Sequence, residues 1–116
     1  MDPAQWMALL QQGDEKALER LLTHYDGMLR YIAGGILDHP QELEDCLAQV
    51  RAKLWEGRHQ YDREKASPTT WLTALCRNTA YYFYYERERV TTLDYDFLAA
   101  IQTKAEGYTI YADLCA

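Results

Sequence analysis

Residues 61–89 read YDREKASPTTWLTALCRNTAYYFYYERER, and this stretch decides the fold. It predicts a charged loop and then a helix that begins at Ser67-Pro68, because serine is a favoured N-cap and proline a favoured first helical residue. The helix is expected to run to about residue 90, and it contains five consecutive aromatic residues, 81–85. An inward face uses only every third or fourth position, so the run must also place rings on the outside of the helix. Exposed rings beside arginines suit stacking on nucleic-acid bases or docking on a partner protein.

The rest of the chain also predicts helices. Capping residues and glycines place the first two over residues 3–12 and 14–37, and Pro40 begins a third over residues 40–57. A short fifth helix is expected over residues 93–104. Apolar side chains recur at helical spacing, and no strand alternation is present. The sequence therefore predicts an all-α fold, a compact bundle of four to five helices. In the fourth helix the expected inward stripe is Leu72, Leu75, Thr79 and Phe83, helped by Trp71 and Ala80.

Composition and charge limit the classes of function that the chain can have. The chain has 116 residues, enough for one domain, and its net charge is −6. Residues 1–60 and 91–116 are acidic, whereas residues 61–90 carry five basic and four acidic side chains. Affinity for a polyanion rests on neutralised phosphates, so any DNA contact should be local rather than spread over the surface.

Several classes of protein are disfavoured. No stretch approaches the roughly 20 apolar residues of a membrane span, and no signal peptide is apparent. The three cysteines, Cys46, Cys76 and Cys115, have neither a disulfide pattern nor zinc spacing, which favours a reducing, cytoplasmic setting. No catalytic set or phosphate-binding glycine loop is visible, so we expect neither an enzyme nor a bound metal or cofactor.

Three blocks, in order and spacing, resemble region two of a bacterial sigma factor of the extracytoplasmic-function type. They are LLQQGDEKALERLLTHYDGMLRYIAGGIL at residues 9–37, LDHPQELEDCLAQVRAKLW at 37–55, and YDREKASPTTWLTALCRN at 61–78. The resemblance covers residues 9–89. It implies a sigma region-two-like domain over residues 1–90. Residues 91–116 would then be a linker-like segment without the helix-turn-helix of region four.

The resemblance implies that the helix over residues 40–57 grips the coiled coil of the polymerase clamp. The matching positions are Glu44, Asp45, Gln49, Val50, Lys53, Leu54 and Trp55. Carboxylates are favoured near a helix start and would meet basic clamp residues there. Val50 and Leu54 also fit the core of the bundle, and Trp55 fits either the core or the interface.

The resemblance also implies that the loop and the fourth helix melt promoter DNA. In the family this part captures a base flipped from the non-template strand of the −10 element, at an unstacking cost of a few kcal/mol. The matching residues are Tyr61, Asp62, Arg63, Lys65, Ser67, Thr69, Thr70, Arg77, Asn78, Tyr81, Tyr82, Tyr85, Arg87 and Arg89. Trp71 is expected to pack under the loop. Asn78 is expected either to read a base edge or to bond within the fold.

The chain departs from the family pattern at four places. Ala48-Gln49 stands for a Gln-Glu pair, Arg51 for a bulky aromatic, Pro68 for the loop aromatic, and Tyr82 for an acidic residue. The basic run that usually follows is interrupted by acidic and tyrosine residues. The helix is therefore expected to bind single-stranded DNA more by stacking than by charge, at about 1–3 kcal/mol per base.

Two classes of function remain. The first is a transcription-initiation domain whose partners are core RNA polymerase, the single-stranded −10 element and, by the same resemblance, an anti-sigma factor. The second is a helical protein-interaction module without DNA activity, in which residues 81–85 form a docking surface or the seam of a homodimer.

Overall fold

The computed structural model describes residues 1–88, and they form a bundle of helices. The elements are α1 (Pro3–Gln11), α2 (Glu15–Gly34), α3 (Pro40–Glu56), a 3₁₀ turn η1 (Arg58–Gln60) and α4 (Pro68–Glu88). No strand occurs among the described residues, and the predicted all-α fold is confirmed. The expected fifth helix and the linker-like segment, 91–116, lie outside residues 1–88.

Helix starts and ends follow from local chemistry. The Asp2 side chain accepts a hydrogen bond from the Gln5 amide at 2.9 Å, and the Gln5 side chain accepts one from the Asp2 amide at 2.8 Å. This capping box fixes the start of α1. Gly13 follows α1 with a φ of +93°, in the left-handed region that glycine adopts most easily. The side chain of Asp14 then caps α2 through the Lys16 amide at 2.9 Å.

Helix α2 ends three residues earlier than the sequence indicated, at Gly34 rather than residue 37. The Gly35 amide turns back to the carbonyls of Tyr31 and Ile32, at 3.1 and 3.3 Å, and closes the last turn. Two successive glycines are poor helix formers, which explains the early end. The segment from Gly35 to His39 then carries the chain to α3.

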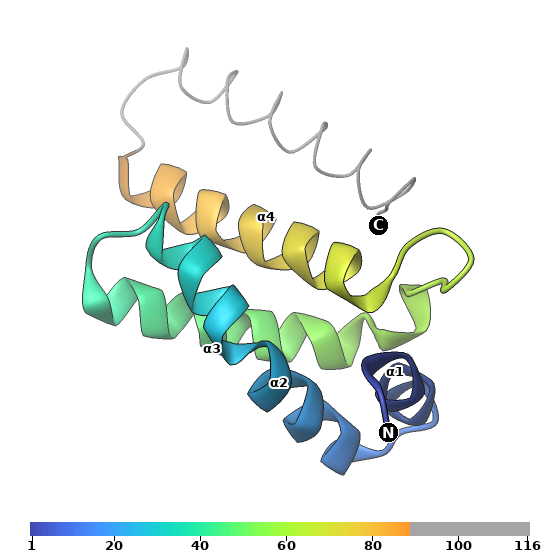
Figure 1. The fold of residues 1–116 in the computed structure, drawn as a ribbon. Coiled ribbons are helices and arrows are strands. Elements are labelled where there is room, and N and C mark those ends of the chain that lie inside the picture. The colour runs from blue at the N-terminus through green and yellow to red at the C-terminus, as the bar shows by residue number, and fades with distance from the viewer. Residues whose placement is uncertain (89–116) are drawn as a thin grey trace.

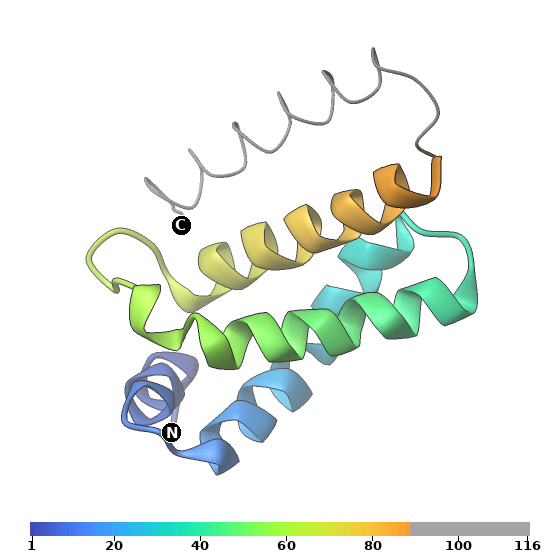
Figure 2. The ribbon, with the colours of Figure 1, turned by 180° about the vertical axis from the view of Figure 1, so that it is seen from behind.

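Helices α3 and α4 run roughly antiparallel, and α2 crosses them obliquely (Figure 1). Seen from behind, α1 lies at the end of the bundle where α3 leads into η1 (Figure 2). A polar contact fixes α1 there, because the Gln11 side-chain amide donates to the carbonyls of Arg58 and Tyr61 at 2.9 and 2.8 Å. Helix α1 thus supports the start of the loop before α4.

The core lies where the four α-helices of the described residues meet. Its most buried large side chains are Met7, Leu10, Leu21, Val50, Leu54 and Leu72, each at most 1% exposed. The predicted inward stripe of α4 is confirmed, since Leu72, Thr79, Trp71 and Ala80 are buried and Leu75 and Phe83 pack against the core from its edge.

Two buried cysteines belong to this core. Burial raises the pKa of Cys46 to about 11 and the pKa of Cys76 to about 12. Because the thiolate is the reactive form, both thiols behave as small apolar side chains at neutral pH. Both are free thiols, and Cys115 lies outside the described residues.

Candidate nucleic-acid interface

The loop before α4 rests on an aromatic pair. The Tyr61 ring meets the Trp71 ring edge-on, with 5.4 Å between centroids, and the two residues are only 7% and 6% exposed. The Tyr61 hydroxyl donates to the Ala66 carbonyl at 2.9 Å, and burial raises the pKa of this hydroxyl. Trp71 packs under the loop as predicted. Tyr61, expected to contact DNA, also lies beneath the loop, so its ring is not available for stacking in this structure.

The turn of the loop is fixed by Asp62. Its carboxylate accepts the Glu64 amide at 2.8 Å, and its carbonyl accepts the amides of Lys65 and Ala66. Such an Asx turn orders the backbone without help from tertiary contacts. Arg63 and Lys65 project from it as exposed cations, and neither forms an ion pair within residues 1–88.

The predicted hydroxyl residues fix the start of α4. Ser67 Oγ accepts the Thr70 amide at 3.1 Å, which makes it the N-cap that the sequence predicted. Thr69 Oγ1 shares a hydrogen bond of 2.9 Å with the Tyr25 hydroxyl of α2. The hydroxyls therefore help to hold the loop, α4 and α2 together, although Ser67, Thr69 and Thr70 are themselves exposed.

The next turns of α4 carry a cation and an amide. Arg77 is exposed and makes no ion pair with any described residue, and Asn78 beside it is half-buried. The Asn78 side chain has no hydrogen-bond partner in the described part of the chain. Because these two groups have no partner in the described residues, the guanidinium can bind a phosphate and the amide can bind a base edge.

The five aromatic residues divide between two faces of α4. Phe83 and Tyr84 pack against the core. Tyr82 is 48% exposed, whereas Tyr81 is half-buried and stacks on Tyr85 with 6.3 Å between centroids and 24° between ring planes. Of the three rings expected to contact DNA, Tyr81, Tyr82 and Tyr85, only Tyr82 is exposed, and the other two are half-buried.

Arg87 forms ion pairs within the fold. Its guanidinium pairs with Glu42 at 3.1 Å and Asp38 at 3.6 Å, near the start of α3, and with Glu88 at 3.1 Å. It also lies 5.7 Å from the Tyr84 ring. These contacts tie the end of α4 to α3, so Arg87 offers less free charge to DNA than the sequence implied. Arg89 lies outside the described residues.

Helix α3 contributes a polar outer face. Glu44, Asp45, Gln49 and Lys53 are exposed there. Val50 and Leu54, expected among the polymerase contacts, are 0% exposed and belong to the core, so they can support that face only from below. Trp55 is half-buried, and the Arg58 guanidinium lies 4.0 Å above its ring.

Ion pairs between α2 and α3 hold this face. Arg30 donates to Glu44 at 2.7 Å and pairs with Asp26 at 3.2 Å, and the hydrogen bond from Arg30 lowers the pKa of Glu44. Arg51, one of the departures from the family pattern, pairs with Glu19 on α2. Sequence reasoning did not find these pairs, because residues 14 and 32 positions apart meet only once the helices are packed.

No group of metal-ligating side chains gathers among residues 1–88. Within the same residues no helix is both long and apolar enough to cross a membrane.

The described residues thus define an all-α domain with one ion-paired polar face and one face of rings and cations. The model of the sigma-70 region 2 family matches residues 21–90, and the chain belongs to this family. The chain is also 27% identical over 81 residues to the ECF RNA polymerase sigma factor RpoE of Cereibacter sphaeroides. That match covers 66% of this chain and 45% of the relative, so this chain spans less than half of the relative's length. No solved structure matches the chain.

Proposed function

We propose that this chain is the region-two domain of an extracytoplasmic-function sigma factor. It binds core RNA polymerase through α3, and it captures the single-stranded −10 element with the loop 61–67 and the exposed face of α4. The observation that carries this proposal is a set of exposed or half-buried side chains without ion pairs in the described residues, which together form the proposed binding surface: Arg63 and Lys65 on the loop, and Arg77, Asn78 and Tyr82 on α4.

The loop is suited to receive a flipped base because it is preorganised. Tyr61 and Trp71 form its floor, the Asx turn of Asp62 fixes its backbone, and Ser67 fixes the start of α4. A loop already ordered in the free protein adds little entropy cost to binding. That matters here, since flipping a base costs a few kcal/mol and one stacking contact returns about 1–3 kcal/mol.

Polymerase binding is assigned to the exposed residues of α3. Glu44, Asp45, Gln49 and Lys53 would meet the clamp coiled coil, with the edge of Trp55 as an apolar anchor. Arg30 holds the Glu44 carboxylate in one place, which favours recognition by a basic partner. Val50 and Leu54 keep the helix in position from the core side.

Polymerase carries the chemistry in this proposal, and the domain acts as a binding module without a metal or cofactor of its own, in the cytoplasm. An anti-sigma factor is a further expected partner. It would regulate the domain by covering either the face of α3 or that of α4.

Binding to a labelled single strand tests the DNA part. The probe is the tightest oligonucleotide of about eight nucleotides selected from a randomised library, a length typical of single-strand sites. Tyr82→Ala should weaken binding by about 5- to 150-fold, the range that one lost stacking contact of about 1–3 kcal/mol gives. Tyr82→Phe keeps the ring and is the matched control, with affinity expected to stay within twofold.

Salt dependence provides a second readout. Three cations of this surface, Arg63, Lys65 and Arg77, are without ion pairs in the described residues. Single strands give a slope of about −0.7 per neutralised phosphate, so log affinity should fall with log salt at a slope near −2. The proposal fails if no strand is selected at low salt and neither core polymerase nor its isolated clamp helices retain the chain in a pull-down.

A second candidate function is a protein-interaction module on the same fold. It is favoured by the exposed Tyr82 and by the stacked pair of Tyr81 and Tyr85 on a chain of net charge −6. In that case light scattering should detect a concentration-dependent homodimer that Tyr82→Ala disrupts, and no oligonucleotide should bind.

A further inference from the structure

Helix α1 holds the entry of the loop 61–67 through one side chain. The Gln11 side-chain amide donates to the Arg58 carbonyl at 2.9 Å and to the Tyr61 carbonyl at 2.8 Å. A side-chain amide has two N–H donors, so both are used here. The two carbonyls belong to the first residue of η1 and to the first residue of the loop. One side chain therefore fixes how the chain turns from η1 into the loop.

Neither carbonyl has another partner in the described part of the chain. Within residues 1–88 no backbone amide donates to the Arg58 or Tyr61 carbonyl, and Gln11 supplies the side-chain donor that both share. Gln11 is half-buried at the end of α1, so solvent has limited access to the contact. Because a polar group without a partner is unfavourable away from water, loss of the Gln11 donors would favour a rearrangement of this turn.

A second line of contacts runs from α1 to the other end of the loop. The Trp6 ring meets the His24 ring edge-on, with 5.4 Å between centroids, and the His24 ring meets the Tyr25 ring edge-on at 4.8 Å. The Tyr25 hydroxyl shares its hydrogen bond of 2.9 Å with Thr69 Oγ1, in the first turn of α4. The loop is thus connected to α1 directly at its entry, and through α2 at its exit.

Helix α1 lies outside the part of the chain that matches the sigma-70 region 2 family, since that match begins at residue 21. The helix is nevertheless fixed in the fold, because Met7 and Leu10 are at most 1% exposed in the core. Core packing explains these two apolar residues, but it does not explain an amide at position 11. The hydrogen bonds of that amide within residues 1–88 go to the turn and to the loop, which points to a role in ordering them.

We propose that Gln11 is a positioning residue for binding of the −10 strand. It keeps the entry of the loop in the conformation that receives a flipped base, and it acts on DNA only through the loop. Gln11 holds the Tyr61 carbonyl while the Tyr61 hydroxyl donates to the Ala66 carbonyl, so release of the first contact loosens the floor of the loop. An ordered loop adds less entropy cost to binding than a loose one. The inference rests on the proposed function and extends it to α1.

Two variants of Gln11 remove the donors and keep the length of the side chain. Gln11→Met has no donor, and Gln11→Glu places a carboxylate opposite two carbonyls. On the 116-residue chain, Gln11→Met should weaken binding of the selected oligonucleotide described above by about 2- to 12-fold, the factor that one lost hydrogen bond gives. Gln11→Glu should weaken binding further, because its carboxylate repels both carbonyls.

Gln12 is the matched control position. It is the next residue along the chain, it is exposed, and its side chain forms no hydrogen bond within residues 1–88. Gln12→Glu adds the same charge as Gln11→Glu, and Gln12→Met adds the same apolar side chain as Gln11→Met. Both control variants should bind the oligonucleotide within twofold of the parent protein.

Two further measurements separate a positioning role from a general loss of structure. Backbone amides of residues 61–67 should exchange their hydrogens faster in Gln11→Met, while those of α3 keep their protection. Capture by the clamp helices, which is assigned to the outer face of α3, should stay unchanged. The effect of Gln11 is thus expected on DNA binding and not on polymerase binding.

The outcomes separate this inference from the proposed function. If Gln11→Met and Gln11→Glu bind the oligonucleotide as tightly as the parent protein, the inference is overturned and the proposed function stands. A parallel loss of clamp capture also overturns it, because Gln11 would then support the whole fold. An equal loss of affinity in Gln12→Glu does the same, since the effect would be one of charge alone. If the parent protein binds no oligonucleotide, both proposals fall together.

Discussion

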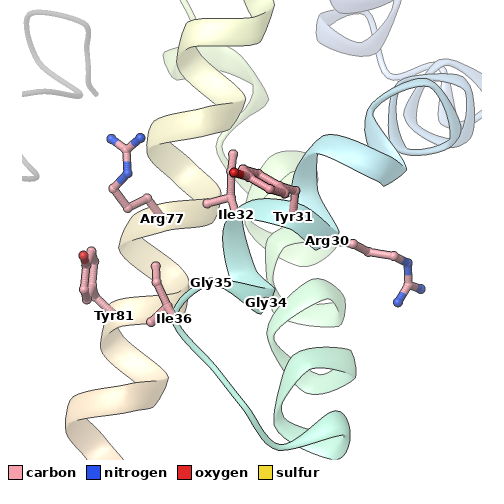
Figure 3. Close-up of a pocket in the computed structure, with 8 residues that line it drawn as sticks. All are labelled: Arg30, Tyr31, Ile32, Gly34, Gly35, Ile36, Arg77 and Tyr81. Carbon is pink, nitrogen blue, oxygen red and sulfur yellow. The ribbon is translucent and has the colours of Figure 1, made fainter.

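Helix α2 separates two surfaces of different character. On the side of α3, Arg30 pairs with Asp26 and Glu44, and Glu19 pairs with Arg51. On the side of α4, Tyr31 is exposed and Arg77 has no ionic partner in residues 1–88. Figure 3 shows the division at consecutive positions of α2: both Arg30 and Tyr31 line the pocket between α2 and α4, but the Arg30 guanidinium points away from Arg77 and Tyr81.

Under the proposed function, the difference explains how an acidic chain offers a site for a polyanion. Charges paired within the fold contribute little to an approaching strand, so the arginines of the α3 side mainly fix the geometry of that face. Arg63 and Lys65 on the loop and Arg77 on α4, by contrast, form no ion pair within residues 1–88. Affinity there is expected to come from rings supported by a small local charge, rather than from the net charge of the protein.

The largest effect is expected inside α3, where adjacent residues belong to different surfaces. Leu54 is 0% exposed, and Leu54→Ala should lower the free energy of unfolding by about 2–5 kcal/mol because it leaves a cavity. Lys53→Ala, one position earlier and exposed, should change it by no more than about 0.5 kcal/mol while weakening capture of the clamp helices. Urea unfolding and a pull-down check the pair. Equal stability losses would remove the distinction between the two faces of α3.

Next in size is the support of the loop on the α4 side. Tyr61→Phe keeps the ring against Trp71 but loses the hydrogen bond to the Ala66 carbonyl, at a cost of about 1 kcal/mol. The loop should then exchange its amide hydrogens faster, and single-strand affinity should fall. Tyr31→Phe removes an exposed hydroxyl and is the control for stability. An unchanged unfolding midpoint in Tyr61→Phe would show that this bond does not order the loop.

Much of the fold was predictable because its determinants are local. The capping residues Asp2 and Asp14 and the first-turn prolines Pro40 and Pro68 placed every described α-helix start within one residue. Periodicity identified the inward stripe of α4. The end of α2 was misplaced because its last apolar residues, Ile36 and Leu37, continue the helical spacing although the two glycines break the helix.

The site was less predictable because its residues act through tertiary contacts. The sequence does not reveal that Tyr61 lies under the loop rather than on it, or that Arg87 is held by carboxylates near the start of α3. It also gave no sign of Arg51 pairing with Glu19. Tyr31 could have been suspected, since it falls outside the apolar spacing of α2. Nothing local, however, indicates that α4 brings Arg77 to the same pocket.

A smaller effect is expected at the C-terminal end of α2. Gly34→Ala should raise the free energy of unfolding by about 0.4–1 kcal/mol, because alanine restricts the unfolded chain and its Cβ meets nothing in the folded one. Gly13→Ala is the matched control, and it should destabilise the protein because φ is +93° there. Thermal unfolding measures both. A loss of stability in Gly34→Ala would mean that the space beside Gly34 is closed in solution, and that α2 and α4 pack more tightly there than in the structure.

The smallest effect concerns the ion pair that fixes the α3 side. Arg30 holds the pKa of Glu44 below its ordinary value of 4.5, so the folded state favours the charged carboxylate. The stabilisation is therefore fully present above that ordinary pKa and is lost as the pH falls through the lower pKa of the folded state. Glu44→Gln should lower the unfolding midpoint slightly at neutral pH, and the difference should disappear in strong acid and shrink in high salt.

Arg77→Gln should leave the midpoint unchanged at every pH, since no described carboxylate pairs with Arg77. If Arg77→Gln destabilised the protein as much as Glu44→Gln, the cation on the α4 side would serve the fold, and the contrast between the two sides of α2 would not hold.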